Sequence, residues 1–289
     1  LSVSSAASDV YKRQILYKRP IIKPRIRTCS PIMNDANLFT GFDIGIPLNI
    51  FSNIFTNLHY GYDITTPKSV LIQFLLGYYT YGKDRYNDAL EYIAEPLQYN
   101  STKQELYNFI YNNRDNYNIT LSLSFIAIVY ILLTSVSNTD EIVYNVPFIP
   151  LFYLNGEYKS FKPLLGEYKA IYIGIMWCLA SLVLPCVLYE HNYDILNYPL
   201  DYVPCILTLF ATSNFADNRD IDEDKMNGIM TFPVKYGITT ANIVSFIALV
   251  ISSLTLIENP HFENRIWING FVELQNFAVM GLLYNSTFN

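Results

Sequence analysis

The sequence predicts an all-α protein that crosses a membrane several times. Of its 289 residues, 51% are hydrophobic and only 15% are charged, whereas a soluble domain carries about a quarter charged residues. Apolar runs recur along the chain, and most approach the roughly 20 residues that a helix needs to cross about 30 Å of hydrocarbon. Lipid-exposed backbone must satisfy its own hydrogen bonds, and the runs lack the alternation of barrel strands. We therefore expect a polytopic bundle of transmembrane helices.

Two segments precede the first apolar run. Residues 1–14 lack the apolar core of a secretory signal and look like a translated sequencing adapter, so we expect them to contribute nothing to the fold. Residues 15–35 form a basic, proline-rich N-terminal arm that fits either a cytoplasmic segment or the remnant of a transit peptide. The transmembrane domain is then expected to cover residues 36–289.

Eight spans are expected in that domain. They lie at about 37–58, 66–82, 118–137, 140–154, 170–189, 197–216, 238–257 and 266–286. The runs within 119–138, 170–189 and 236–257 carry no charge, whereas 140–154 is short and interrupted by Pro147 and Pro150. Residues 89–117 are polar and rich in Tyr and Asn, and we expect them to form a partly helical cap loop outside the membrane.

The positive charges favour one orientation of these spans. Ten of the twelve Lys and Arg residues after position 27 fall in loops that this topology places on one face, and only Lys68 and Arg265 fall opposite. Such a bias marks the cytoplasmic side, or the stromal or matrix side in an organelle. The sequence therefore predicts an integral, multi-pass membrane protein with its charged loops on that side.

Several kinds of site are not indicated. The four cysteines lack metal-ligand spacing, and three lie in apolar runs, which is typical of core residues. The glycine patterns of nucleotide-binding loops are absent, and nothing suggests nucleic-acid binding. An EF-hand loop beginning at Asp220 is excluded because Lys225 stands where the loop needs Gly, and Thr231 where it needs Glu.

Two acidic groups lie at the ends of spans on the predicted cytoplasmic face. Asp84 and Asp88 are four residues apart, on one face of a helix. Asp217, Asp220 and Asp224 would also share a face if the helix before them continued through all three. Clustered carboxylates repel one another, and their oxygens suit Mg²⁺, which often shares its remaining positions with phosphate. Facing each other, the groups could hold two ions around a diphosphate, whereas a solvated acidic loop is the alternative.

The second group belongs to a longer pattern. It reads Asp217-x-x-Asp220-x-x-x-Asp224-Lys225-x-x-Gly228-x-x-Thr231-x-Pro233-Val234-x-x-Gly237. This pattern resembles the second aspartate-rich motif of the UbiA superfamily of intramembrane prenyltransferases. Asp84-Arg85-x-x-Asp88-Ala89 resembles the family's first motif, and Tyr158-x-x-x-Lys162 resembles its Tyr-x-x-x-Lys element, with Trp177 in the next span. The resemblance covers about residues 37–287.

The chain departs from the family pattern in two ways. Thr80 stands where the first motif usually begins with Asn, which concerns one substrate contact. The family has nine transmembrane helices, whereas eight are counted here, so we expect the last to be missing from a shortened or truncated chain.

The resemblance implies a prenyltransferase that moves a prenyl group from an isoprenoid diphosphate donor to a lipophilic or aromatic acceptor within the membrane. Its cofactor would be Mg²⁺, which makes the diphosphate a better leaving group. The implied metal ligands are Asp84, Asp88, Asp217, Asp220 and Asp224. The implied catalytic residues are Asp84, Asp88, Asp220, Asp224 and Lys162. The implied substrate-binding residues are Arg85, Tyr158, Lys162 and Lys225.

Some residues and functions stay open at this stage. Asp43, a carboxylate inside the first predicted span, is a further substrate-binding candidate because intramembrane carboxylates are usually functional. Arg85, Lys159, Lys162 and Lys169 also fit simple positive-inside anchors. A polytopic cation-binding transporter and a catalytically inactive prenyltransferase-like scaffold are the alternative functions. A transporter would favour acidic groups at mid-membrane, whereas here they lie at span ends.

Overall fold

The computed structural model describes the following parts of the chain: residues 41–60, 64–94, 101–135, 142–189, 201–226, 228–257, 274 and 276–283. The predictions for segments 1–14 and 15–35 lie outside these residues, as does most of the predicted span at 266–286. In the part that is described, every regular element is a helix and none is a strand. The predicted all-α class is therefore confirmed.

The helices vary widely in length, and several follow one another with little or no connection. In chain order they are η1 (Phe42–Ile44), α3 (Gly45–Tyr60), α4 (Pro67–Ala94), α5 (Ser101–Asn112), α6 (Arg114–Thr134), α7 (Ile142–Asn145), α8 (Phe148–Gly156), α9 (Tyr158–Leu165), η3 (Gly166–Tyr168), α10 (Lys169–Cys178), η4 (Leu179–Val183), α11 (Leu184–Leu188), α12 (Tyr202–Asp217), α13 (Ile221–Met226), α14 (Phe232–Tyr236) and α15 (Ile238–Ile257). Residues 276–283 form one more helical segment.

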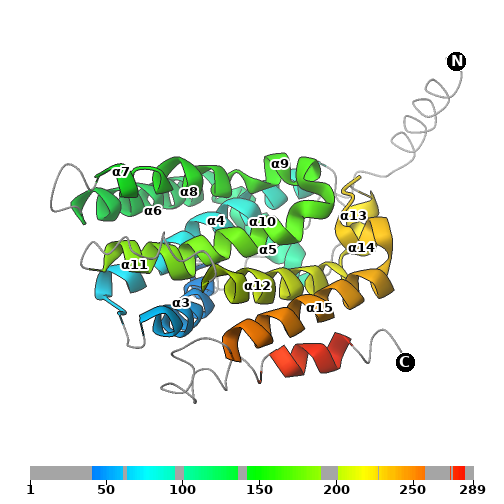
Figure 1. Ribbon diagram of the computed structural model, residues 1–289. Helices are drawn as coiled ribbons and strands as arrows, with labels where there is room; N and C mark the ends of the chain where they lie inside the picture. The colour runs from blue at the N-terminus through cyan, green and yellow to red at the C-terminus, as the bar shows by residue number, and fades with distance from the viewer. Residues whose placement is uncertain are drawn as a thin grey trace, which may run out of the picture. The chain divides into compact units, whose positions relative to one another are not determined.

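Two helices organise the packing. The long helix α4 contacts α3, α5, α6 and α8, whereas α12 lies between α10 and α15 (Figure 1). A large apolar core joins the first set of helices to η4 and α11, and a smaller one lies around α12 and α15. Polar side chains also join α12 to α15: the Asn214 amide donates hydrogen bonds to the Ala241 carbonyl at 3.2 Å and to the Ser245 hydroxyl at 2.9 Å.

Within the described residues, three helical stretches are long and apolar enough to cross a membrane. They are Arg114–Thr134, Tyr158–Leu188 and Ile238–Leu256. The eight predicted spans do not all correspond to described helices that are long and apolar enough to cross a membrane. Helices α3 and α12 have 16 residues each, and α8 within the predicted span 140–154 has only 9. Pro147 precedes α8 directly, which separates it from the short helix α7.

The predicted cap loop at 89–117 is mostly helical. Helix α4 continues from the predicted span to Ala94, α5 covers Ser101–Asn112, and α6 begins at Arg114. The sequence after position 82 is charged but contains no proline until Pro96, and charge alone does not end a helix. Because α5 packs on α4, the cap contributes directly to the site described below.

The helix that carries Asp217 does not continue through Asp220 and Asp224, so the condition for a shared helical face is not met. Helix α12 ends at Asp217, and α13 begins at Ile221 after a turn. In this turn the Arg219 and Asp220 amides donate to the carbonyls three residues earlier, at 3.1 Å each. The first aspartate is thereby separated from the other two.

A π-helical turn lies in the middle of the stretch Tyr158–Leu188. It is η4, and Pro185, which lacks an amide hydrogen, follows it at the start of α11. The carbonyl of Ala180 in this turn accepts a hydrogen bond from the Gln73 amide of α4 at 3.4 Å. Such turns occur frequently at functional sites, and Ala180 lines the cavity described next.

Candidate active site

A cavity of about 720 Å³ lies among α4, α8, α9, α10 and α13. Along α4 its lining changes from apolar at Leu76 to charged at Asp84 and Asp88, and along α10 it changes from charged at Lys169 to apolar at Met176. Apolar residues form one part, including Leu76, Phe152, Ile173, Met176 and Trp177. Charged residues from α4, α9, α10 and the segment at 220–224 form the other part, including Asp84, Asp88, Lys159, Lys162, Lys169, Asp220 and Asp224. The cavity thus suits a molecule with an anionic head and an apolar body.

The first acidic group lies on α4 and is bound by cations. The Lys159 ammonium pairs with an oxygen of Asp88, and it also contacts Glu91 at 2.9 Å. The Arg85 guanidinium lies 3.9 Å from the other Asp88 oxygen, which also accepts a hydrogen bond from the Tyr107 hydroxyl of α5 at 3.2 Å. Sequence reasoning missed Tyr107, since its partner lies 19 residues away and in another helix.

Burial raises the pKa of Asp84, and the neighbouring charge of Asp88 raises it further. Lys159, Arg85 and Lys162 oppose this shift. A carboxylate in this position gains from any additional positive charge, because its own charge is desolvated and faces a like charge.

The second acidic group is divided by the turn after α12. Asp224 is buried, and one of its oxygens lies 3.2 Å from the Lys162 ammonium. Asp220 is exposed but lines the cavity. Asp217 is buried and does not line it; its Oδ1 lies 2.6 Å from the ammonium of Lys169. Two glycines in the pattern that runs from Asp217 to Gly237 have positive φ, +70° at Gly228 and +86° at Gly237. This conformation favours glycine.

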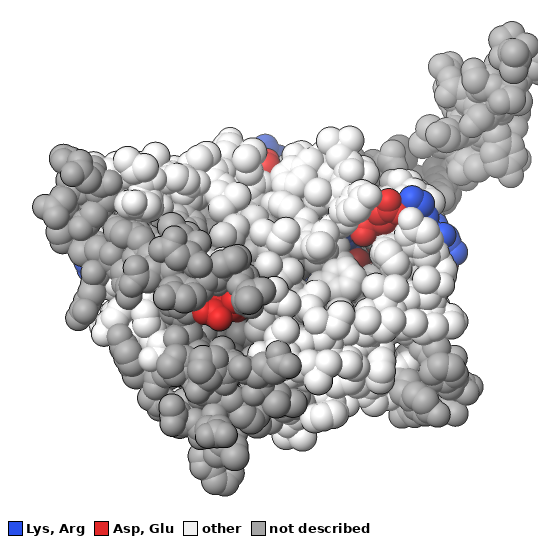
Figure 2. Space-filling model, viewed as in Figure 1, with Lys and Arg blue, Asp and Glu red and all other residues white. Residues whose placement is uncertain are grey.

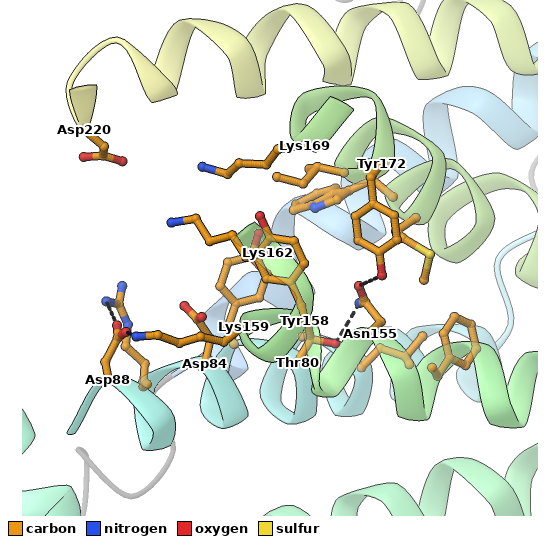
Figure 3. Close-up of a pocket in the computed structure, with 18 of the residues that line it drawn as sticks. Thr80, Asp84, Asp88, Asn155, Tyr158, Lys159, Lys162, Lys169, Tyr172 and Asp220 are labelled. Carbon is orange, nitrogen blue, oxygen red and sulfur yellow. Dashed lines mark hydrogen bonds and ion pairs between the residues drawn. The ribbon is translucent and has the colours of Figure 1, made fainter. Parts of the chain in front are cut away.

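Members of the two acidic groups, without Asp217, face each other across the cavity. Figure 3 shows Asp220 on one side and Asp84 and Asp88 on the other, and the ammonium groups of Lys162 and Lys169 extend into the space between them. The lysines that pair with the aspartates all come from one short segment, 159–169, which spans α9 and the start of α10. This segment therefore supplies much of the positive charge of the site.

A short chain of hydrogen bonds lies beside the charged part of the cavity. The Tyr172 hydroxyl donates to the side-chain oxygen of Asn155 at 3.1 Å, and the Asn155 amide donates to the Thr80 hydroxyl at 3.2 Å (Figure 3). The ring of Tyr158 stacks on Tyr172 with centroids 5.7 Å apart, and the Tyr158 hydroxyl is buried with no hydrogen-bond partner among the described residues. Asn155 and Tyr172 were not identified from the sequence, because nothing in their own neighbourhood marks them.

Two predicted substrate-binding residues are not in this site. Asp43 lies in the 3₁₀ turn η1 with an exposed side chain, and it does not line the cavity. Lys225 is exposed on α13 and does not line it either. Both lie beside residues that face inward, and the sequence alone did not show which way each side chain points.

The carboxylates fit a magnesium site that water and phosphate complete, and they do not fit a site built from protein ligands alone. Among the described residues, no group of three or more His, Cys, Asp or Glu side chains could hold a metal ion. The Oδ2 atoms of Asp217 and Asp224 are buried, and no hydrogen-bond partner for either lies in the described part of the chain. Magnesium is commonly held by one or two carboxylates together with water and substrate phosphate, not by an all-protein cage. Asp84 with Asp88, and Asp220 with Asp224, match that ligand set.

Comparisons with models of protein families, with curated proteins and with solved structures found no match for this chain.

Proposed function

We propose that this protein is a magnesium-dependent prenyltransferase, which moves a prenyl group from an isoprenoid diphosphate to a lipophilic or aromatic acceptor within the membrane. The observation that carries the proposal is the two-part cavity. Its charged part joins the two acidic groups to Lys159 and Lys162, and its apolar part is lined by residues such as Phe152 and Met176. A prenyl diphosphate has the same division between a polyanionic head and a hydrocarbon tail.

The charged part of the cavity would bind the head of the donor. Arg85 and Lys162 present donors that suit phosphate oxygens, and hydrogen bonds between charged partners are the strong ones. Magnesium, held by Asp84 and Asp88 on one side and by Asp220 and Asp224 on the other, would supply the charge that makes diphosphate a good leaving group. Tyr158 adds a hydroxyl that has no partner within the described chain.

The apolar part would hold the tail and exclude water. In the reaction, the bond between the first prenyl carbon and the diphosphate oxygen breaks, and the diphosphate leaves with the electron pair. The acceptor forms a new bond to that carbon and loses a proton. Aromatic faces stabilise nearby cations, and Trp177, Tyr158 and Tyr172 line the cavity where the allylic carbon would lie.

The proposed orientation follows the charge pattern of the loops. The acidic groups and segment 159–169 belong to the face that the positive-inside bias assigns to the cytoplasm, stroma or matrix. A water-soluble magnesium ion and the released diphosphate would then exchange with that compartment. The membrane lipids would surround the three long apolar helices.

Transfer assayed on the purified protein in detergent tests the proposal. Isoprenoid diphosphates of several lengths would be mixed with phenolic and lipophilic acceptors in the presence of Mg²⁺, and products identified by mass spectrometry. We expect Asp84→Asn and Asp220→Asn to lower transfer by at least about a thousandfold, and magnesium chelation to abolish it. Asp222→Asn is the matched control, since Asp222 is an exposed aspartate of α13 outside the cavity.

The same preparation distinguishes the alternative functions. Binding of a donor diphosphate without product for any acceptor would indicate an inactive scaffold. Cation flux in vesicles, with neither donor binding nor transfer, would indicate a transporter. Undiminished turnover by Asp84→Asn and Asp220→Asn would overturn the proposed mechanism.

A further inference from the structure

We propose that Lys169 is an additional binding residue for the diphosphate head and that Asp217 positions it, instead of binding magnesium. The inference deepens the proposed function and rests on it for the identity of the anion. It reverses the role that the resemblance implies for Asp217, and it gives Lys169 a role beyond that of a positive-inside anchor.

The two side chains lie differently relative to the cavity. Lys169 lines the cavity, whereas Asp217 does not. The ammonium of Lys169 and Oδ1 of Asp217 are 2.6 Å apart, and the two side chains are only 9% and 6% exposed. The carboxylate is therefore buried in the protein interior, whereas the ammonium that it binds reaches the space where the substrate would bind.

Lys169 differs from the other lysines of the site in where its paired aspartate lies. Lys159 and Lys162 pair with Asp88 and Asp224, which themselves line the cavity. Magnesium bound at those aspartates would compete with both lysines for the carboxylates. The partner of Lys169 lies outside the cavity, so its ammonium keeps its place whether or not ions are bound. An ammonium has three donors, and Asp217 Oδ1 takes one of them, which leaves two for phosphate oxygens.

The backbone of two packed helices fixes the positions of Lys169 and Asp217. Lys169 is the first residue of α10, and Asp217 is the last residue of α12. The two helices run antiparallel and close together, since a Cβ added at Gly174 would lie 2.8 Å from the Ile206 carbonyl oxygen. The turn after α12 then directs the chain to Asp220 and Asp224, which line the cavity. Asp217 is thus held by the helix pair, and not by the segment that carries the other aspartates.

A purely structural ion pair between α10 and α12 is the competing explanation. Breaking a buried pair by removing one partner strongly destabilises a protein, whereas removing both charges together is often tolerated. Stability alone therefore does not separate the explanations. Binding of inorganic diphosphate and of a metal ion does, because the structural explanation predicts no change in either for a variant that remains folded.

The experiment measures two affinities on full-length protein in detergent micelles. Mn²⁺ binding is followed by electron paramagnetic resonance, and binding of inorganic diphosphate in the presence of Mg²⁺ by calorimetry. The variants are Lys169→Met, Asp217→Asn, the double variant and Lys169→Arg. Lys235→Met is the matched control, because Lys235 pairs at 2.5 Å with Glu167 outside the cavity.

We expect Lys169→Met to weaken diphosphate binding about tenfold or more and to leave Mn²⁺ affinity within about twofold of wild type. Asp217→Asn should show the same pattern, and the double variant should bind no more weakly than the worse single variant, because the residues act as one unit. Lys169→Arg should recover part of the lost affinity. If the single variants do not fold, the double variant, which leaves no unpaired buried charge, gives the same two readouts.

Loss of Mn²⁺ binding in Asp217→Asn, comparable with that in Asp220→Asn, would overturn the positioning role. Wild-type diphosphate affinity in folded Lys169→Met, or in the double variant if the single variants fail to fold, would overturn the binding role. Neither readout requires prenyl transfer. A protein that binds diphosphate through Lys169 but yields no product would contradict the proposed function and leave this inference intact.

Discussion

Most aspartates of the site each form an ion pair with a lysine. Asp224 illustrates this, because its side chain is 2% exposed and its charge is met by Lys162 at 3.2 Å. Its second oxygen is buried and has no hydrogen-bond partner within the residues that the structure describes. A buried carboxylate of this kind depends strongly on the cation beside it, and a second cation at the free oxygen would stabilise it further.

Lys162→Met should therefore destabilise the protein by about 3–5 kcal/mol, the usual cost of leaving one member of a buried pair uncompensated. Addition of Mg²⁺ should recover more of the Tm in this variant than it adds to wild type, because the ion would replace the missing charge at Asp224. Thermal unfolding in detergent with and without Mg²⁺ measures both effects. An equal Mg²⁺ shift in the two proteins would argue against magnesium at Asp224.

Asn155 offers a second test at this scale. It accepts a hydrogen bond from Tyr172 and donates one to Thr80, and all three line the cavity. Asn155→Leu should raise the KM for the acceptor about tenfold, because both hydroxyls lose their partner and the wall loses a polar amide. Steady-state kinetics with donor and acceptor varied separately would show this, with the donor KM as the internal control. A change in the donor KM alone would contradict it.

At the scale of elements, the sequence predicted best where an apolar run is free of charge. The predicted spans at 170–189 and 238–257 agree with the stretch from α10 to α11 and with α15 to within one residue. Helix α4 continues to Ala94, beyond the predicted span end at position 82, because charged residues after that position still favour a helix. The break after Asp217 could not be predicted, since Asn218, Arg219 and Asp220 contain neither proline nor glycine.

The sequence reveals site residues that are close together in the chain, but not those whose partners are distant in it. Asp84, Asp88, Asp220 and Asp224 were found because short spacings marked them. Lys169 and Asn155 act through partners 48 and 75 residues away, and no local pattern records such contacts. A lone lysine at the start of an uncharged run was the one available signal for Lys169.

The crossing of α10 and α12 is the element on which Lys169 and Asp217 depend. Gly174→Ala would bring a Cβ to 2.8 Å from the Ile206 carbonyl oxygen, so the helices must separate. We expect a loss of about 1–3 kcal/mol in stability, the typical cost of overpacking, and weaker diphosphate binding. Gly281→Ala is the matched control, because a Cβ there meets nothing within 4 Å. Equal Tm values for the two variants would contradict the close crossing.

At the scale of the whole described chain, apolar side chains remain exposed along the long helices. On α6 the exposed residues follow helical spacing on one face: Ile119, Leu123, Ile126, Tyr130 and Leu133. Most of the described surface in Figure 2 carries no charge, and a group of charged side chains lies beside α13 and α14. A continuous apolar stripe on a helix long enough to cross the bilayer is what contact with lipid requires.

Ile126→Lys tests this directly, because Ile126 lies in the apolar half of α6 and its side chain is 61% exposed. A lysine at the centre of a membrane helix costs about 3 kcal/mol relative to an apolar residue on insertion scales. We expect a lower fraction of the variant to resist alkaline carbonate extraction from membranes. Asp115→Lys, at the polar start of α6 and 91% exposed, should insert as wild type does. Normal insertion of Ile126→Lys would mean that this face of α6 meets water or a partner protein, and the lipid boundary would then have to lie on other helices.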